Sequence, residues 1–337
     1  MINKVTISTR VRFARNFRDF PFSDMMNNLQ FEQIIEKISS AIKKIKISGG
    51  FELIRLSELN EIDCIALVEN HLISPKLLEN KAVAALLLSK DHSASIMINE
   101  EDHIRIQIIL PGQKTQEAYQ QAVKIDKELE VLGYACDAKY GYLTSCPTNT
   151  GTAMRVSIML HLPAIIKTGN LEKAIESCNR LGIAVRGMYG ENSEVLGHMI
   201  QISNQVTLGH NEEDLVTSVE TIANQVVAWE LQLRDSMLLK DRIGIEDEVY
   251  RAFGVLANAR RLKTKEALEL LSDLRTGVDM GLISAISKNT LDELQVVVQP
   301  ATIQKLAGRS MNATERDILR ADLVRDRIEQ RGGIEDV

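Results

Sequence analysis

Val5-Thr6-Ile7-Ser8-Thr9-Arg10-Val11-Arg12-Phe13, near the start of this 337-residue chain, alternates apolar and polar residues with a period of two. This period is that of a β-strand, in which successive side chains point to opposite faces of the sheet. One face of the strand would turn Val11 and Phe13 toward a core, and the other would carry Arg10 and Arg12. We therefore predict a half-buried strand with an arginine-bearing polar face.

Further strands and helices are predicted through the first half of the chain. Strand-like patterns recur at four places, 104–108, 156–162, 182–186 and 199–208. Helical patterns occupy two stretches between the strands, 31–44 and 115–130. Arg105 and Arg155 fall on the polar side of the first two of these strands. The expected fold class is α+β, with a large antiparallel sheet flanked by helices.

The second half of the chain has a helical pattern. From Asn211 onward the apolar residues recur at three and four positions, which is the period of an amphipathic helix. Three motifs are typical of helix starts, Asn211-x-x-Asp214, Thr290-x-x-Glu293 and Thr314-x-x-Asp317. An apolar stripe is predicted at Leu268, Leu271 and Leu274. We place a boundary near residues 235–245, which divides the chain into domains 1–235 and 236–337, the second all-α.

The composition is that of a globular protein with a large core. The chain has 40 lysines and arginines against 46 aspartates and glutamates, a net charge of −6, and 45% hydrophobic residues. An acidic chain is a poor partner for nucleic acid. The longest apolar run, Ala82–Leu88, has seven residues, far below the roughly 18–20 that span a bilayer. Because the first residues also lack the apolar core of a signal peptide, we expect a cytoplasmic protein with no membrane contact.

Arginines on the polar faces of the predicted strands are the first candidate functional feature. They are Arg10, Arg12, Arg105, Arg155 and Arg186. One guanidinium group can donate two parallel hydrogen bonds to a phosphate group, and it stays charged at physiological pH. A sheet face that gathers several guanidinium groups therefore suits a polyphosphate. The chain has no glycine-rich phosphate-binding motif, so a backbone cradle would not hold a nucleotide. The alternative is that the arginines are scattered over the solvated face of an open sheet.

Two polar loops carry further candidate groups. Residues 99–103 include three consecutive acidic residues before the Arg105 strand, which could anchor a cation or accept a proton, or form an ordinary turn. The loop 145–152 leads into the Arg155 strand and contains Cys146, whose thiol could be activated by nearby guanidinium groups. No Cys-x-x-Cys spacing occurs, so we predict free thiols throughout and a core position for Cys64 and Cys178.

Several long motifs occur in one order along the chain. They are Ser8-Thr-Arg-Val-Arg12, Asn99-Glu-Glu-Asp-His-Ile-Arg105, Cys146-Pro-Thr-Asn-Thr-Gly-Thr152 and Arg186-Gly187. Together they resemble the signature of the ATP:guanido phosphotransferases, the creatine and arginine kinase family, over about residues 5–235. The stretches 142–149 and 185–191 are most similar to the bacterial protein arginine kinases. Arg316-Asp-Ile-Leu-Arg-Ala321 resembles the Arg-Asp-x-x-Arg-Ala motif with which those kinases recognise phosphoarginine.

The resemblance implies ATP and Mg²⁺ as cofactors, and no metal-binding residue is assigned. The implied ATP-binding residues are Ser8, Thr9, Arg10, Val11, Arg12, His71, Arg105, Arg155, Arg186, Gly187 and Glu191. Glu101 would orient the target guanidinium and take its proton, and Cys146 would contact the same group. Such help is needed because a guanidinium is protonated near pH 7 and its lone pairs are delocalised. The implied allosteric phosphoarginine site is Arg316, Asp317, Arg320 and Ala321.

The implied activity is phosphorylation of arginine side chains in proteins, as part of protein quality control and the stress response. Implied partners are the ClpC/ClpP protease, the repressor CtsR and the activator McsA, and the helical domain would form a homodimer. Metabolite kinases of the family enclose the substrate with an N-terminal helical domain, whereas only seven residues precede Ser8 here. We therefore expect an open site. Two alternatives remain, a catalytically weak phosphoarginine-binding adaptor and a kinase of a free guanidino metabolite.

Overall fold

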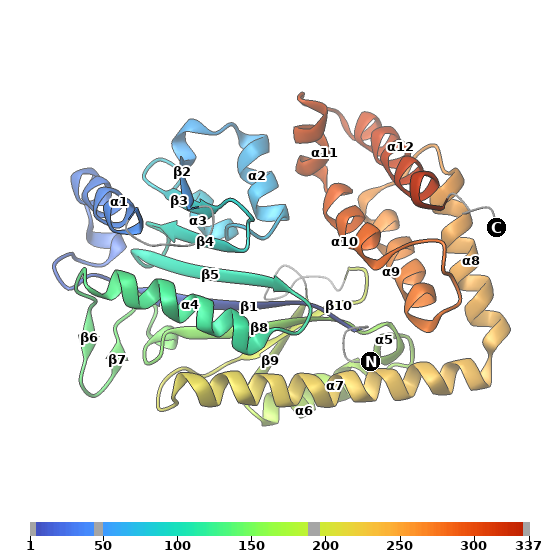
Figure 1. Ribbon diagram of the computed structural model, residues 1–337, viewed down its shortest axis with the longest axis horizontal. Coiled ribbons are helices and arrows are strands. Elements are labelled where there is room, and N and C mark those ends of the chain that lie inside the picture. The colour runs from blue at the N-terminus through green and yellow to red at the C-terminus, as the bar shows by residue number, and fades with distance from the viewer. Residues whose placement is uncertain (1–4, 44–49, 188–195, 333–337) are drawn as a thin grey trace.

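The computed structural model describes residues 5–43, 50–187 and 196–332 (Figure 1). Within them an eight-stranded antiparallel sheet has the order β2-β3-β4-β5-β1-β8-β10-β9. Its strands are β1 (Thr6–Arg15), β2 (Phe51–Arg55), β3 (Ala85–Ser89), β4 (Ala94–Ile98), β5 (Ile104–Pro111), β8 (Met154–His161), β9 (Ile183–Gly187) and β10 (Met199–Asn204). A separate ribbon is formed by β6 (Cys136–Asp137) and β7 (Gly141–Tyr142). The predicted α+β class is confirmed.

β1 runs through the middle of the sheet, between β5 and β8. Val11 and Phe13 are fully buried, whereas Arg10 and Arg12 are half-buried, so the predicted alternation is confirmed. In the register between β1 and β8, Arg12 lies directly opposite Arg155. The pairing of the strands therefore brings arginines from distant parts of the sequence onto one face of the sheet.

The strand predicted over 199–208 is shorter than expected, because β10 ends at Asn204. The register with β9 ends there, where Asn204 pairs with Ile183, the first residue of β9. Beyond that point the chain turns toward the loop before β8, and the Thr207 hydroxyl donates to the carbonyl oxygen of Thr150 at 2.8 Å. The last four residues of the predicted strand, 205–208, therefore run toward this loop and do not continue the strand.

Helices cover the apolar face of the sheet, while the opposite face is only partly covered (Figure 1). The helices packed against the apolar face are α1 (Asn28–Ile42), α4 (Thr115–Glu130), α5 (Pro163–Lys167), α6 (Leu171–Arg180) and α7 (Glu212–Lys240). The opposite face is covered at β3 and β4 by α2 (Glu61–Glu69) and α3 (Pro75–Glu79). Short 3₁₀ helices in the described part of the chain are η2 (Ser23–Met25), η3 (Leu56–Glu58) and η4 (Pro147–Asn149). The polar residues of β1, β5, β8 and β9 lie on this second face.

The remaining helices lie in the second half of the chain. They are α8 (Arg242–Asn258), α9 (Thr264–Met280), α10 (Lys288–Val297), α11 (Pro300–Ala307) and α12 (Ala313–Gly332). All of them except α11, which packs against α2, contribute to a second apolar cluster. The predicted stripe is confirmed, since its three members are buried in this cluster, Leu268, Leu271 and Leu274. We retain the division into domains 1–235 and 236–337 as a proposal. The long helix α7 contributes to both clusters, since Leu233 packs against the first and Met237 against the second.

Two helices start earlier than the predicted capping boxes. The N-cap of α10 is Ser287, whose hydroxyl accepts from the amide of Thr290 at 3.1 Å. In α12, Asn312 accepts from the amide of Glu315 at 3.0 Å, and Glu315 accepts from the amide of Asn312 at 2.8 Å. Thr290 and Thr314 are therefore not caps. Ser287 lies three positions before Thr290 and Asn312 lies two positions before Thr314, and each of these short polar side chains already satisfies an amide of the first turn.

Polar contacts join the helical cluster to the sheet and its covering helices. The carboxylate of Glu69, the last residue of α2, accepts from the amides of Ala301 at 2.8 Å and Thr302 at 2.7 Å. These amides are at the first turn of α11, where a carboxylate is favoured by the unpaired N–H groups of the helix. Farther along the interface, Arg234 of α7 donates to Asp279 of α9 at 3.1 Å. The helical cluster thus contacts the segment that leads from α2 to the polar face.

Other expectations from composition can be compared with the structure. All four cysteines are free thiols, and Cys64 and Cys178 are buried as predicted. The helix start predicted at Asn211 is confirmed, because its side chain accepts from the amide of Asp214 at 2.7 Å. Among the described helices, none combines the length and the apolar character needed to cross a bilayer.

Candidate active site

Five arginines from four strands meet on the polar face of the sheet. They are Arg10 and Arg12 of β1, Arg105 of β5, Arg155 of β8 and Arg186 of β9. They line two cavities of about 150 and 260 Å³, and Arg12, Arg155 and Arg186 contribute to both. Arg10 belongs to the first cavity and Arg105 to the second. The arginines predicted from the strand pattern are therefore gathered, not scattered.

The arginine cluster is electrostatically suited to an anion. Burial, followed by repulsion from Arg105 and Arg155, lowers the pKa of Arg10 to about 10. Burial and the same neighbours, together with Arg10, lower the pKa of Arg12 as well. The Nε atom of Arg12 is buried without a hydrogen-bond partner. Bound phosphate oxygens would offset this repulsion and would offer acceptors to the guanidinium groups.

His71 forms part of the wall of the first cavity, together with residues 73–75. It follows α2 with a positive φ of 58°, and its carbonyl oxygen accepts from Gln107 of β5 at 2.9 Å. Burial, and to a lesser degree Arg10, lowers the pKa of His71 to about 4, so its imidazole is neutral at pH 7. Ser8 lines a smaller adjoining cavity with Arg10 and His71. His71 therefore lies beside the arginine cluster, as expected from the sequence.

The three consecutive acids of the predicted loop have different surroundings. Glu100 is fully buried, and its carboxylate accepts from Arg105 and from the hydroxyl of Ser74. Asp102 is also buried and accepts from the side chain of Asn16 at 2.7 Å. Only Glu101 lines the second cavity. Since the acids diverge, they do not form a cation site, and no cluster of three potential metal ligands exists among the described residues.

The loop with the three acids (99–103) and the loop that contains Cys146 (145–152) are joined by hydrogen bonds. The amide of Ser145 donates to Asp102 at 2.8 Å, and its hydroxyl donates to the carbonyl oxygen of Glu101 at 2.9 Å. The next residue, Cys146, lines the second cavity, and its sulfur lies 3.0 Å from the hydroxyl of Thr148. These bonds place a carboxylate and a thiol on the same cavity as four guanidinium groups. Such a site can hold an anion at one side and a cation against Glu101.

Two of the predicted ATP-binding residues have side chains that point away from the cavities. Thr9 and Val11 are fully buried on the opposite face of β1, because neighbouring residues of a strand alternate between faces. The Thr9 hydroxyl donates there to the carbonyl oxygen of Gly112 at 2.9 Å. Their side chains therefore do not line the cavities. Gly187 ends β9 and lines neither cavity, and Glu191 is outside the described residues.

The predicted phosphoarginine motif lies on α12, but its members differ in exposure. The guanidinium of Arg320 is buried and donates to the carbonyl oxygens of Val298 at 2.6 Å and Leu262 at 2.7 Å, and to Asp317 at 2.7 Å. Arg320 therefore joins helices as part of the packed structure and is not on the surface. Ala321 is fully buried in the helical core. Arg316 is half-buried, and its guanidinium donates to a single backbone carbonyl oxygen, that of Met311, at 2.7 Å.

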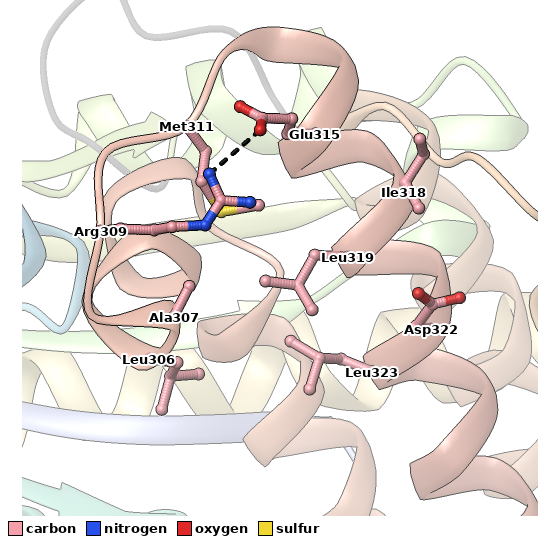
Figure 2. A pocket seen from close by; sticks show the side chains of 9 residues that line it. All are labelled: Leu306, Ala307, Arg309, Met311, Glu315, Ile318, Leu319, Asp322 and Leu323. Atoms are coloured by element: carbon pink, nitrogen blue, oxygen red, sulfur yellow. Dashed lines mark hydrogen bonds and ion pairs between the residues drawn. The ribbon is translucent and has the colours of Figure 1, made fainter.

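A separate pocket of about 420 Å³ lies between α11 and α12 (Figure 2). Figure 2 shows Leu306, Leu319 and Leu323 around it, with Arg309 paired to Glu315 at 3.0 Å near its edge. None of the four motif residues lines this pocket. Its lining is mainly apolar and its one arginine already has an acidic partner, so it is poorly suited to a phosphoguanidinium group.

Sequence reasoning did not single out some residues of the site. Gln201 of β10 accepts from Arg10 at 2.5 Å and lines the first cavity. Its alternation with Ile200 and Ile202 along β10 could have indicated the polar face. Lys76 contacts Glu101 with an Nζ to Oε1 distance of 3.0 Å. No sequence signal indicates this contact, because Lys76 is 25 residues from Glu101 and lies on another element.

Comparison with known proteins gives the same fold and a close set of relatives. Residues 33–233 match the family described as "ATP:guanido phosphotransferase, C-terminal catalytic domain", and residues 242–335 match "Protein-arginine kinase McsB C-terminal domain". The chain is 46% identical over 327 residues to a protein-arginine kinase of Geobacillus sp. (strain WCH70), covering 96% of this chain and 90% of that protein. It is 44% identical over 323 residues to that of Caldanaerobacter subterraneus subsp. tengcongensis, covering 95% and 96%. A solved lombricine kinase has a similar fold, with a TM-score of 0.62, 21% identity and coverage of 70% and 69%.

Proposed function

The chain belongs to the ATP:guanido phosphotransferase family, and we propose that it transfers the γ-phosphoryl group of ATP to arginine side chains of proteins. The observation that carries the proposal is the joining of an anion-binding arginine cluster to a cavity that also contains Glu101 and Cys146. The protein substrate is supported by the names of the relatives, which are protein-arginine kinases at about 45% identity over nearly the whole chain.

The arginine cluster would bind the triphosphate of ATP. Arg12, Arg155 and Arg186 line both cavities, so they can contact phosphate groups on either side of the bond that breaks. Guanidinium groups held by strands need little rearrangement as charge moves toward the leaving ADP, and such fixed charges are an effective source of catalysis. His71, neutral at pH 7, adds no further positive charge to the first cavity.

Glu101 would act on the other reactant, the target guanidinium. Its carboxylate can accept N–H groups from two nitrogens of that guanidinium and so orient one of these nitrogens toward the γ-phosphorus. As the N–P bond forms and the bond to ADP breaks, this nitrogen loses a proton, which Glu101 would accept. Cys146 lies on the same cavity, where its thiolate would attract the substrate cation.

Mg²⁺ would accompany ATP rather than occupy a site made by the protein. No set of three potential metal ligands exists in the part of the chain that the structure describes. The two acids nearest the arginines are already engaged, Glu100 by Arg105 and Glu101 by Lys76. The ion would be held by phosphate oxygens, where it would supply neutralisation of phosphate charge.

The proposed activity has a direct test. The protein is incubated with ATP, Mg²⁺ and an arginine-containing protein such as casein, and phosphate on the casein is located by mass spectrometry under conditions that preserve acid-labile N–P bonds. Phosphorylated arginine side chains support the proposal. Phosphorylation of free arginine but not of casein would favour a metabolite kinase. Phosphoarginine binding without either reaction would favour an adaptor.

Cys146→Ser is expected to lower the rate of arginine phosphorylation by about tenfold, because a hydroxyl cannot replace the charge of a thiolate beside a guanidinium. Alkylation of the thiol should inactivate the enzyme, and ATP together with an arginine substrate should slow this inactivation. The matched control is Cys136→Ser, which replaces an exposed cysteine outside the cavities. Full activity of the Cys136→Ser protein after complete alkylation would remove Cys146 from the mechanism.

We further propose that α12 provides a site for phosphoarginine, with Arg316 and Asp317 as its accessible members. Arg316 would pair with the phosphate and Asp317 with the guanidinium. Arg320 would hold Asp317 in position and would not contact phosphoarginine itself, because its guanidinium is already bonded to Asp317 and to two backbone carbonyl oxygens. Ala321 would contribute only as core.

Arg316→Ala is expected to weaken the binding of free phosphoarginine at least tenfold, since a charged hydrogen bond contributes about 1.5–3 kcal/mol. Calorimetric titration of phosphoarginine measures the change, and ATP binding should remain normal. Arg309→Ala is the matched control, because the Arg309 side chain is 57% exposed and pairs with Glu315 at 3.0 Å. Equal affinity in the Arg316→Ala protein and the wild type would contradict a phosphoarginine site at this position.

The wider role follows from the same proposal. A kinase of this kind would mark proteins for the ClpC/ClpP protease, inactivate the repressor CtsR and work with the activator McsA. Formation of a homodimer through residues 236–337 and action in the cytoplasm are part of the proposal. Their support is the match of residues 242–335 to the C-terminal domain of protein-arginine kinases.

A further inference from the structure

Lys76 occupies one side of the carboxylate that we assign to the target guanidinium. Its Nζ lies 3.0 Å from Oε1 of Glu101, and the nearest guanidinium nitrogen of Arg105 lies 3.8 Å from Oε2. The hydrogen bond with Glu101 raises the pKa of Lys76, so the lysine is an ammonium ion at pH 7. A positive charge of the chain itself therefore stands where a substrate cation would bind.

The position of Lys76 is set by the short helix α3. Its N-cap, Ser74, donates to the buried carboxylate of Glu100 and accepts from the amide of Leu77 at 3.2 Å. Leu77 is fully buried beneath the helix. The backbone at Lys76 is thus fixed against the acidic loop, whereas the lysine side chain is 48% exposed and can turn into solvent.

We propose that Lys76 is a specificity-determining residue, which holds Glu101 in the free enzyme and is displaced by the guanidinium of a substrate arginine. The proposal rests on the proposed function and assigns a new residue to it. Arginine can displace Lys76 because its planar fork reaches both carboxylate oxygens, whereas an ammonium makes a single contact. A substrate lysine would gain nothing in this exchange, since it would only replace one ammonium by another.

The proposal predicts opposite effects of two substitutions on the apparent affinity for protein substrate. In Lys76→Ala the competing ion pair is absent, so KM for an arginine-containing protein should fall about two- to fivefold, the range of a partly exposed ion pair. In Lys76→Arg a guanidinium of the chain itself would pair with Glu101, so the same KM should rise. KM for ATP should remain unchanged in both variants.

The experiment compares these variants with the wild type in steady-state assays at saturating ATP, with casein as substrate. Lys114→Ala is the matched control, because Lys114 has the same 48% side-chain exposure and pairs with Glu117 at 3.5 Å outside the cavities. The same comparison is made without turnover, by calorimetric titration of an arginine-containing peptide in the presence of a non-hydrolysable ATP analogue. A tighter Lys76→Ala complex and a weaker Lys76→Arg complex support the proposal.

Other outcomes overturn it. A higher KM for casein in Lys76→Ala would mean that Lys76 attracts the substrate instead of competing with it. A lower kcat with unchanged KM would place Lys76 with the phosphate-binding charges. Equal peptide affinity in wild type and Lys76→Ala would mean that the ion pair has no competitive effect. Absence of arginine phosphorylation by the wild type would count against the proposed function itself, and the titration would still decide whether Lys76 competes for Glu101.

Discussion

Glu101→Gln should reduce arginine phosphorylation by a factor on the order of 10²–10⁴, the usual contribution of a general base. The amide keeps the size of the side chain but neither carries a charge for the target guanidinium nor accepts its proton. ATP affinity should change little, because the triphosphate is assigned to the arginines and not to Glu101. The measurement is the rate of phosphoarginine formation on casein, together with calorimetric titration of ATP.

The control for this change is Glu117→Gln, which alters an exposed glutamate on α4 and should behave as wild type. If the Glu101→Gln protein turned over near the wild-type rate, the carboxylate would have no part in the transfer step. If it lost ATP binding as strongly as activity, Glu101 would belong to the nucleotide site. The two readouts therefore separate the proposed role from its nearest alternative.

Arg155→Ala should weaken ATP binding by about 10- to 100-fold, because it deletes charged hydrogen bonds to phosphate. Turnover should fall as well, since the same guanidinium is placed to stabilise the phosphoryl group during transfer. Arg155 is suited to this test because, like Arg12 and Arg186, it lines both cavities. Removing Arg105 instead would leave the buried carboxylate of Glu100 without its ion-pair partner, and a loss of stability would confuse the result.

The matched control is Arg180→Ala on α6, where the arginine side chain is 79% exposed and pairs with Glu176 of the same helix. This variant should bind ATP as the wild type does. Thermal unfolding of the Arg155→Ala protein tests whether its fold is retained. Wild-type ATP affinity in Arg155→Ala would mean that the polar face of the sheet does not hold the triphosphate.

Much of the site could be predicted from sequence because its main pattern is local. In a strand the side of each residue follows from its neighbours, so Arg10 and Arg12 are assigned to the polar face by Val11 and Phe13. The ordered motifs added the chemical roles that we propose for Glu101 and Cys146. The pattern could not show which strands become neighbours in the sheet, since no residue of β1 indicates that Arg155 lies opposite Arg12.

The amino-acid sequence by itself determined the helical second half, the face on which the arginines lie, and five of the strands, namely β1, β5, β8, β9 and β10, because each depends on residues close along the chain. It did not indicate β2, β3 and β4 or the order in which the strands pair. The tertiary structure decided how similar residues differ in role. Asn99 turns the chain with a positive φ of 63°, and after it Glu100 packs beneath Arg105 while Glu101 faces the cavity. Likewise, the hydrogen bond from buried Arg320 to the carbonyl oxygen of Val298 depends on packing between distant elements. The ion pair between Lys76 and Glu101 does so too. Burial and contact across such distances follow from how elements pack, and local periodicity carries no information about them.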